Sequence, residues 1–126
     1  MKLTITIFLL SISAFFFNPF PENDIFSTAF KTGNAKEIAK YFGNSVDLNI
    51  PGSEGVYSKA QAEQILKDFF TKNTTKSYNS LHNGTSKDSH YAIGSLITAK
   101  GTFRTYVLYK KEGANITIQE LRLEQE

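Results

Sequence analysis

The sequence predicts an α+β fold in which three N-terminal helices pack on a strongly bent, mainly antiparallel sheet. The first observation is the segment from Val56 to Asn73, whose apolar residues recur at helical spacing. The second is the order of patterns, because two shorter helical segments precede it and four long strand-like segments follow it. The third is size: 126 residues, 40% hydrophobic and 13% aromatic, suffice for one domain with its own core.

The N-terminus has the pattern of a secretory signal peptide. Lys2 precedes an apolar run from Leu3 to Phe17, with small residues at Ser13 and Ala14. This run is shorter than the roughly 20 residues that cross a bilayer, although an uncleaved anchor is the alternative interpretation. We therefore expect a signal peptide at 1–17, a leader at 18–21, one domain at 22–126, and export to the periplasm or the extracellular space. No stable membrane span is expected after processing.

Composition narrows the range of functions. The formal net charge is +2, and the lysines far outnumber the two arginines, which argues against nucleic-acid binding. The chain has no cysteine, so disulfides, thiolate metal sites and cysteine nucleophiles are excluded.

Two short helices are expected before the first strand. Asp24 to Phe30 has apolar residues on one side and is followed by Gly33 as a stop signal. Asn34 and Glu37 have capping-box spacing, and the apolar face that follows predicts a second helix ending at Gly43.

The remaining elements follow from alternation and turn chemistry. Residues 46–50 alternate as a short strand, and 51–55 have the composition of a turn. Ser58 and Gln61 form a capping-box pair at the start of the long helix. Four strands are then predicted at 77–83, 89–99, 102–112 and 116–124, with glycine in each connection.

This order of elements resembles the nuclear-transport-factor-2-like superfamily, in which a bent sheet wraps the helices into a cone with a pocket at its open end. The segment VDLNIPGSEGVYSKAQAEQILKDFF and the closing IQELRLE resemble a bacterial exported family of unknown function within it. The resemblance covers nearly everything after residue 22. It implies a fold but no particular activity, since this superfamily includes enzymes, binding proteins and interaction modules.

Enzymes of the ketosteroid-isomerase type place a catalytic aspartate directly before the proline that ends the first strand. Ile50 stands at that position, before Pro51, and it has no titratable group. Asp47 is expected on the opposite side of the strand, in solvent. We therefore favour a non-catalytic protein, with a pocket enzyme (isomerase, dehydratase or hydrolase) as the alternative, for which two titratable groups should converge inside the cone.

The candidate ligand-binding residues come mainly from the last two strands. A three-residue connection at 112–114 would place Tyr106 opposite Glu120 and Arg104 opposite Arg122, on one face with Leu108 and Ile118. Such a cluster could bind a small polar ligand or form a structural ion-pair network, and a one-residue change in the connection would scatter it.

Two further residues, Tyr57 and His82, complete the candidates. Tyr57 precedes the long helix and either fills the core or contacts a ligand. His82 lies in the middle of a strand and could face inward, whereas His90 is expected in a solvated loop. Two histidines without ligand spacing do not indicate a metal site, and no cofactor motif is present.

The expected partners are a small molecule or a protein, or a second copy of the chain. The strand face that carries Phe103, Thr105, Val107 and Tyr109 is apolar and is expected on the outside of the sheet, where a homodimer would cover it. A pure protein-interaction module is a third hypothesis, for which the protein's own side chains should fill the cone.

Overall fold

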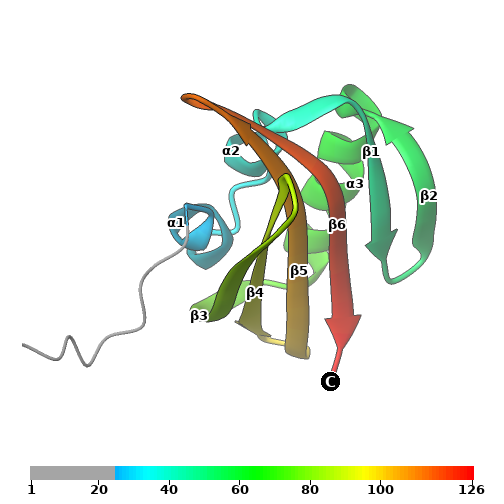
Figure 1. Ribbon diagram of the computed structural model, residues 1–126. Coiled ribbons are helices and arrows are strands. Elements are labelled where there is room, and N and C mark those ends of the chain that lie inside the picture. The colour runs from blue at the N-terminus through cyan, green and yellow to red at the C-terminus, as the bar shows by residue number, and fades with distance from the viewer. Residues whose placement is uncertain (1–24) are drawn as a thin grey trace, which may run out of the picture.

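The computed structural model of the protein describes residues 25–126, and the expected signal peptide and leader lie outside this range. The helices are α1 (Ser27–Lys31), α2 (Ala35–Ala39) and α3 (Lys59–Lys72). The strands are β1 (Phe42–Ile50), β2 (Ser53–Ser58), β3 (Thr75–Ser86), β4 (Ser89–Thr98), β5 (Gly101–Glu112) and β6 (Asn115–Gln125). All the helices lie on one side of the sheet (Figure 1), so the predicted α+β class is confirmed.

The sheet has the order β2-β1-β6-β5-β4-β3. Every neighbouring pair is antiparallel except β1 and β6, which run parallel. The parallel pair arises because β1 and β2 form one hairpin, α3 then carries the chain to the far edge, and the meander β3 to β6 returns to β1. The two halves of the sheet therefore meet at the β1–β6 pair.

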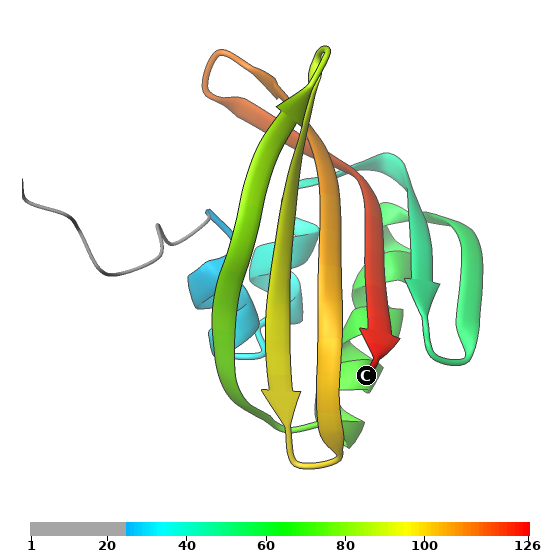
Figure 2. The ribbon, with the colours of Figure 1, turned by 60° about the horizontal axis from the view of Figure 1, so that its bottom comes forward.

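The long strands curve around the helices along their whole length (Figure 2). Register shifts interrupt the pairing of β3 with β4 between Ser80 and His82, and that of β5 with β6 between Leu108 and Tyr109. An extra residue on one strand bends that strand and increases its twist. These bulges account for part of the curvature that closes the sheet over α3.

Helix α3 begins where its sequence indicates. The Ser58 hydroxyl accepts a hydrogen bond from the Gln61 backbone amide at 3.3 Å, and the Ser58 amide donates to the Gln61 side-chain oxygen at 3.3 Å. This reciprocal pair satisfies two amides that a helix start otherwise leaves without partners. The predicted capping box is confirmed, although Val56 and Tyr57 belong to β2 rather than to the helix.

The two short helices differ from prediction at their ends. Helix α1 ends near Gly33, whose φ of +61° suits glycine, and the Asn34 side chain accepts from the Glu37 amide at 3.2 Å at the start of α2. Helix α2 stops at Ala39, and Phe42 already pairs with Ile118 in β6. The predicted end at Gly43 was wrong, because pairing across the sheet extends β1 toward its N-terminus.

Strand β2 is an element that the turn-like composition of 51–55 concealed. Ser53 pairs with Ile50, and Gly55, at a φ of +144°, pairs with Leu48. Its residues alternate between half-buried and exposed. Ser53, Glu54 and Gly55 carry little β propensity, so cross-strand pairing with β1 decides this half of the strand, whereas Val56 and Tyr57 favour a strand by themselves.

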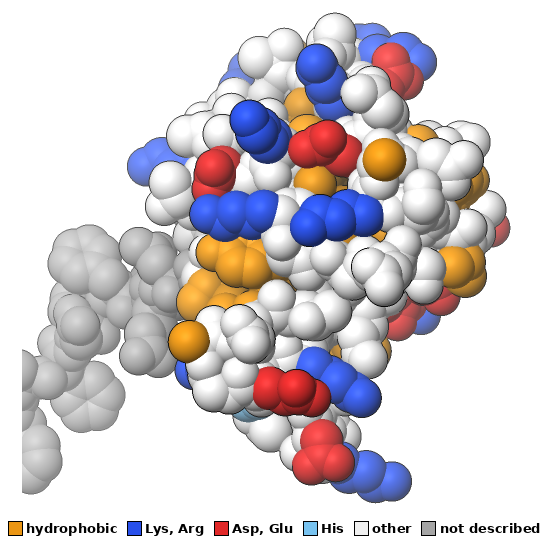
Figure 3. Space-filling model, turned by 90° about the horizontal axis from the view of Figure 1, so that it is seen from above, with side chains coloured by type: hydrophobic (Ala, Val, Ile, Leu, Met, Phe, Trp, Pro, Cys, Tyr) orange, Lys and Arg blue, Asp and Glu red, His pale blue; other side chains and the backbone are white. Residues whose placement is uncertain are grey.

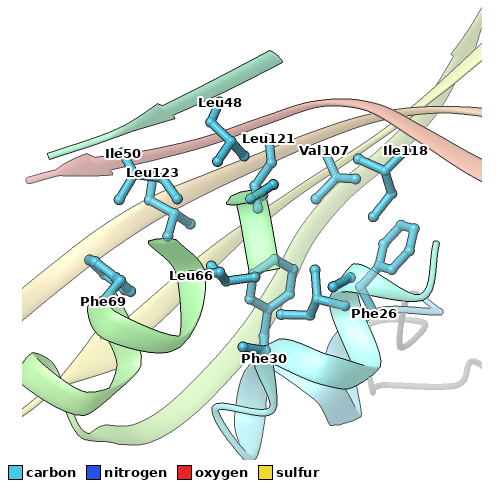
Figure 4. Close-up of a cluster of buried hydrophobic side chains, with 14 of the residues drawn as sticks. Phe26, Phe30, Leu48, Ile50, Leu66, Phe69, Val107, Ile118, Leu121 and Leu123 are labelled. Atoms are coloured by element: carbon cyan, nitrogen blue, oxygen red, sulfur yellow. The ribbon is translucent and has the colours of Figure 1, made fainter. Parts of the chain in front are cut away.

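The core lies between α3 and the concave face of the sheet (Figure 4). Leu66 and Phe69 point from α3 toward the sheet residues Leu121 and Leu123, and Phe26 and Phe30 fill the region beneath the other end of β6. Phe30 also stacks on Tyr78 of β3, with ring centroids 5.0 Å apart. The protein's own side chains therefore fill the centre of the cone. This is the arrangement expected of a protein-interaction module, so a small-molecule site would have to lie at an end of the cone.

The face of β5 that packs on this core is the opposite of the one expected. Phe103, Thr105 and Val107 are buried, whereas Arg104 is exposed and Tyr106 is half-buried on the convex side. The prediction that Phe103, Thr105, Val107 and Tyr109 form an outer face was wrong, because the helices already cover that face. Within residues 25–126, no helix has both the length and the apolar character needed to cross a membrane.

Candidate functional site

A cleft of about 540 Å³ lies at one end of the molecule, where the C-terminal half of α3 meets the β1–β2 and β4–β5 turns (lower end in Figure 1). This is the open end of the cone, where the sheet no longer closes over the helix. Its lining comes from Ile50, Pro51, Ser53, Gln64, Ile65, Asp68, Phe69, Lys72, Asn73, Lys100, Phe103 and Gln125.

The floor of the cleft is the outer layer of the core. The rings of Phe69 and Phe103 meet edge to face, with centroids 5.0 Å apart. Ile50 is buried beside them, and Ile65 is half-buried on the side of α3. Phe69, Phe103 and Ile50 are only 2–6% exposed, so the half-buried Ile65 offers the apolar surface from which a ligand would displace water.

The rim is polar. Lys72 donates to Asp68 at 2.8 Å across one helical turn, and both side chains are well exposed. The Asn73 side-chain amide donates to the Phe69 carbonyl at 2.9 Å and so closes the end of α3. Lys100 and Gln125 complete the rim from the sheet side. An apolar floor with a few convergent polar groups is the usual composition of a small-molecule site.

A second, shallower hollow of about 470 Å³ extends the cleft along α3. It is lined by Tyr57, Ala60, Gln61, Gln64 and Ile65, so Gln64 and Ile65 belong to both hollows. Tyr57 is half-buried against the core, and its hydroxyl donates to the Glu54 carbonyl at 3.5 Å. Of the candidate residues from the sequence, Tyr57 is the one that borders this region.

The candidate cluster on the last two strands lies elsewhere, on the convex face of the sheet. Tyr106 pairs with Arg122 rather than with Glu120, and Arg104 pairs with Glu124 rather than with Arg122. The predicted register was wrong because the connection has two residues, Gly113 and Ala114, instead of three.

A bulge in the pairing of β5 with β6 nevertheless places the polar candidates on one face of the sheet. With a two-residue turn alone, Glu120 would face away from Tyr106, but the register shift beyond Leu108 turns it back. Ile118 lies before this shift and is fully buried on the other face. The four polar candidates therefore share the convex face, away from the cleft, and the expected place of Ile118 beside them was wrong.

Local charge pairing dominates the electrostatics of the convex face. The Arg122 guanidinium donates to the Glu120 carboxylate and lies over the Tyr106 ring, 5.5 Å from its centroid. The hydrogen bond to Glu120 and its charge raise the pKa of Arg122 above its ordinary value. At the other end of the molecule, Glu37 raises the pKa of Lys40 in the same way. Both shifted groups are exposed and lie outside the cleft.

Only one of the two histidines lies on the concave side of the sheet: His90 shares a face of β4 with the buried residues Ala92 and Leu96 and pairs with Tyr109. His82 is exposed on the convex side, where its Nε2 lies 3.2 Å from the Tyr91 hydroxyl. His90 lies in β4 rather than in a loop, and its ring stacks on Tyr109 with centroids 5.3 Å apart. Across residues 25–126, no group of three or more His, Asp or Glu side chains is arranged to hold a metal ion.

Charge of both signs is mixed on the face seen in Figure 3, where basic side chains lie among acidic ones around apolar groups. That face therefore has no broad region of one sign.

Most of the cleft was not apparent in the sequence. Ile50 was recognised only as the residue that replaces an acid, and Phe103 was assigned to the wrong face. Lys100 stands in a turn beside Gly101, a signal that indicates a connection but not a site. These residues converge only because the β1–β2 and β4–β5 turns meet at the end of α3.

Comparison with known families supports the fold. Residues 23–124 match the family described as "Domain of unknown function (DUF4783)". The chain is similar to a DUF4783 protein from Bacteroides ovatus, with 34% identity, 80% of this chain and 92% of the other covered, and a TM-score of 0.75. A DUF4783 protein from Bacteroides uniformis matches with 34% identity, 79% and 92% coverage and a TM-score of 0.72.

More distant similarity extends to a designed protein named "Rd1NTF2_04 with long sheet", at 15% identity, with 78% of this chain and 92% of the other covered and a TM-score of 0.61. That level of identity supports the fold alone. No protein with curated annotation matches the sequence. The predicted resemblance is thus confirmed: the chain belongs to the DUF4783 family and has a nuclear-transport-factor-2-like fold.

Proposed function

We propose that this protein is an exported, non-catalytic binding protein that holds a small molecule in the cleft at the open end of the cone. The observation that carries the proposal is the cleft's apolar floor, with Phe69 and Phe103 side by side beneath a polar rim. Its volume of about 540 Å³ falls within the range typical of small-molecule sites. Export rests on the signal-peptide pattern of residues 1–17, which lie outside the described residues.

The chemistry of the lining favours binding over proton transfer. Ile50 lines the cleft at the position where an isomerase relative would carry its acid. Asp68 is the single carboxylate among the lining residues, and it is exposed and paired with Lys72. Ile50 has no proton to transfer, and the Asp68 carboxylate is already bound by the Lys72 ammonium at the exposed rim rather than held inside the cone.

The cleft predicts binding of an uncharged apolar probe such as N-phenyl-1-naphthylamine. We expect its fluorescence to rise with the wild-type protein, and Ile65→Glu to weaken binding about tenfold or more, because a carboxylate would then need to be desolvated against the probe. Val56→Glu is the matched control, since Val56 is 71% exposed and lies outside both hollows. Equal affinity in the two variants, or no binding by the wild type, would contradict the proposal.

A second candidate function is pairing of two chains through the convex face of the sheet. The half-buried residues Tyr91, Ile93 and Ile97 of β4 lie beside Tyr106 and Leu108 of β5 and form an apolar stripe. Exposed charges of both signs border the stripe on β5 and β6, so two copies related by a twofold axis could align opposite charges. This stripe, and not the buried Phe103 face, supports a homodimer.

Sedimentation equilibrium tests this pairing. We expect a dimer for the wild type, and we expect Ile93→Lys to shift the population to monomer, because a charge at the centre of the stripe would be buried without a partner. Ser45→Lys, on the exposed part of β1, should leave the dimer intact. A wild type that remains monomeric at high concentration would remove the homodimer from consideration.

A further inference from the structure

We infer that the cleft selects amphipathic carboxylates, with the Lys100 ammonium meeting the carboxylate and the apolar chain of the ligand lying along α3. This inference rests on the proposed small-molecule function and names the class of ligand. It follows from three features of the cleft: its charge balance, its turn geometry and its length.

Lys100 supplies the unbalanced charge of the cleft. Three lining residues are ionic, and two of them, Asp68 and Lys72, neutralise each other at 2.8 Å. Lys100 has no carboxylate within ion-pair distance among residues 25–126. The C-terminal end of α3 carries a partial negative charge, but Lys72 in its last turn and the Asn73 amide offset that charge. The remaining preference is for an anion.

The turn that carries Lys100 is held in place by hydrogen bonds. The hydroxyl of Thr98, a residue only 4% exposed, donates to the Gly101 carbonyl at 2.8 Å and accepts from the Lys100 amide at 3.2 Å. The Lys100 carbonyl accepts a weaker bond from the Gln125 side chain at 3.4 Å. A fixed backbone lowers the entropy lost when the side chain meets a ligand, so Lys100 can contribute more than a lysine on a loose loop.

The apolar path is long enough for an alkyl chain. The two hollows share Gln64 and Ile65 and together extend along α3 from Gln61 to Phe69. The eight steps from Gln61 to Phe69, each with a rise of 1.5 Å, span roughly 12 Å. Tyr57 borders the far end of this path, and Lys100 borders the near end. A single charged group at one end of an apolar path fits a ligand with one polar head and an unbranched tail.

Titration with decanoate, decanol and decylamine, followed by amide chemical shifts at low ionic strength, tests the inference. We expect decanoate to shift the signals of the cleft residues and to bind tighter than decanol by up to about fivefold, the upper end of what one exposed ion pair provides. Lys100→Gln should bring the ratio of the decanoate and decanol affinities to about one. The control Lys111→Gln, an exposed lysine at the other end of β5, should keep the preference.

The possible outcomes distinguish failure of the carboxylate preference from failure of small-molecule binding itself. Equal binding of decanoate and decanol at the cleft, tighter binding of decylamine, or a preference that survives Lys100→Gln would overturn the carboxylate assignment while small-molecule binding stands. If none of the three probes shifts the cleft signals and N-phenyl-1-naphthylamine also fails to bind, the proposed function itself is wrong.

Discussion

Replacing Leu66 by alanine is expected to lower the free energy of unfolding by about 3–5 kcal/mol. Leu66 is fully buried at the centre of α3 and points at the concave face of the sheet (Figure 4). Truncation removes the transfer free energy of the side chain and leaves a cavity, which the curved sheet on one side and the helical hairpin on the other cannot collapse to fill. Urea denaturation followed by circular dichroism measures the loss.

Ile65→Ala is the matched control for this prediction. Ile65 is the preceding residue on the same helix, yet it is half-buried at the cleft and already contacts solvent. Its truncation should cost about 1 kcal/mol or less, because water can occupy the space that the side chain leaves. Similar losses in the two variants would mean that α3 is not the element on which the sheet packs.

Gly94→Ala is the second change with a large expected effect, a loss of about 2–3 kcal/mol of stability. A Cβ at Gly94 would lie 2.1 Å from the Tyr78 hydroxyl and 2.3 Å from the ring carbon that bears it. Tyr78 cannot easily move, because its ring stacks on Phe30 and its hydroxyl accepts from Thr105 at 3.4 Å. The strain would therefore spread into α1 and β3, and thermal unfolding should show a lower midpoint.

Gly84→Ala is the comparison for Gly94→Ala, because Gly84 also lies against a tyrosine ring but is expected to lose less stability. A Cβ at Gly84 would lie 2.3 Å from the Tyr91 ring, but Tyr91 is half-buried on the convex face and can turn toward solvent. We expect a loss below about 1 kcal/mol. A larger loss for Gly84→Ala than for Gly94→Ala would show that the convex face is as tightly packed as the core, which would strengthen the case for a covering partner.

Local signals in the sequence were enough to predict the helices and the long strands. The Ser58–Gln61 capping box and the spacing of Leu66 and Phe69 involve residues within one or two helical turns, so no distant contact is needed to interpret them. The exposed side chain of Asp47 and the buried one of Ile50 also follow from simple alternation along β1.

The orientation of β5 could not be predicted from local sequence signals. Its two faces, Phe103–Thr105–Val107 and Arg104–Tyr106–Leu108, both contain large apolar groups. The more apolar face, which was expected on the outside of the sheet, is the buried one, because the helices cover it. The register of β5 against β6 could not be predicted from local sequence either, because the turn residues Gly113 and Ala114 do not reveal the bulge opposite Leu108.

The sequence by itself determined the α+β class, the N-terminal caps of α2 and α3, and the family. The tertiary structure alone decided which face of β5 is buried, that β2 exists, and that Lys100 and Phe103 meet the end of α3. The physical reason is the range of the interactions involved. Caps and periodicity depend on neighbours a few residues away, whereas the cleft depends on strand pairings and bulges that join segments far apart in the chain.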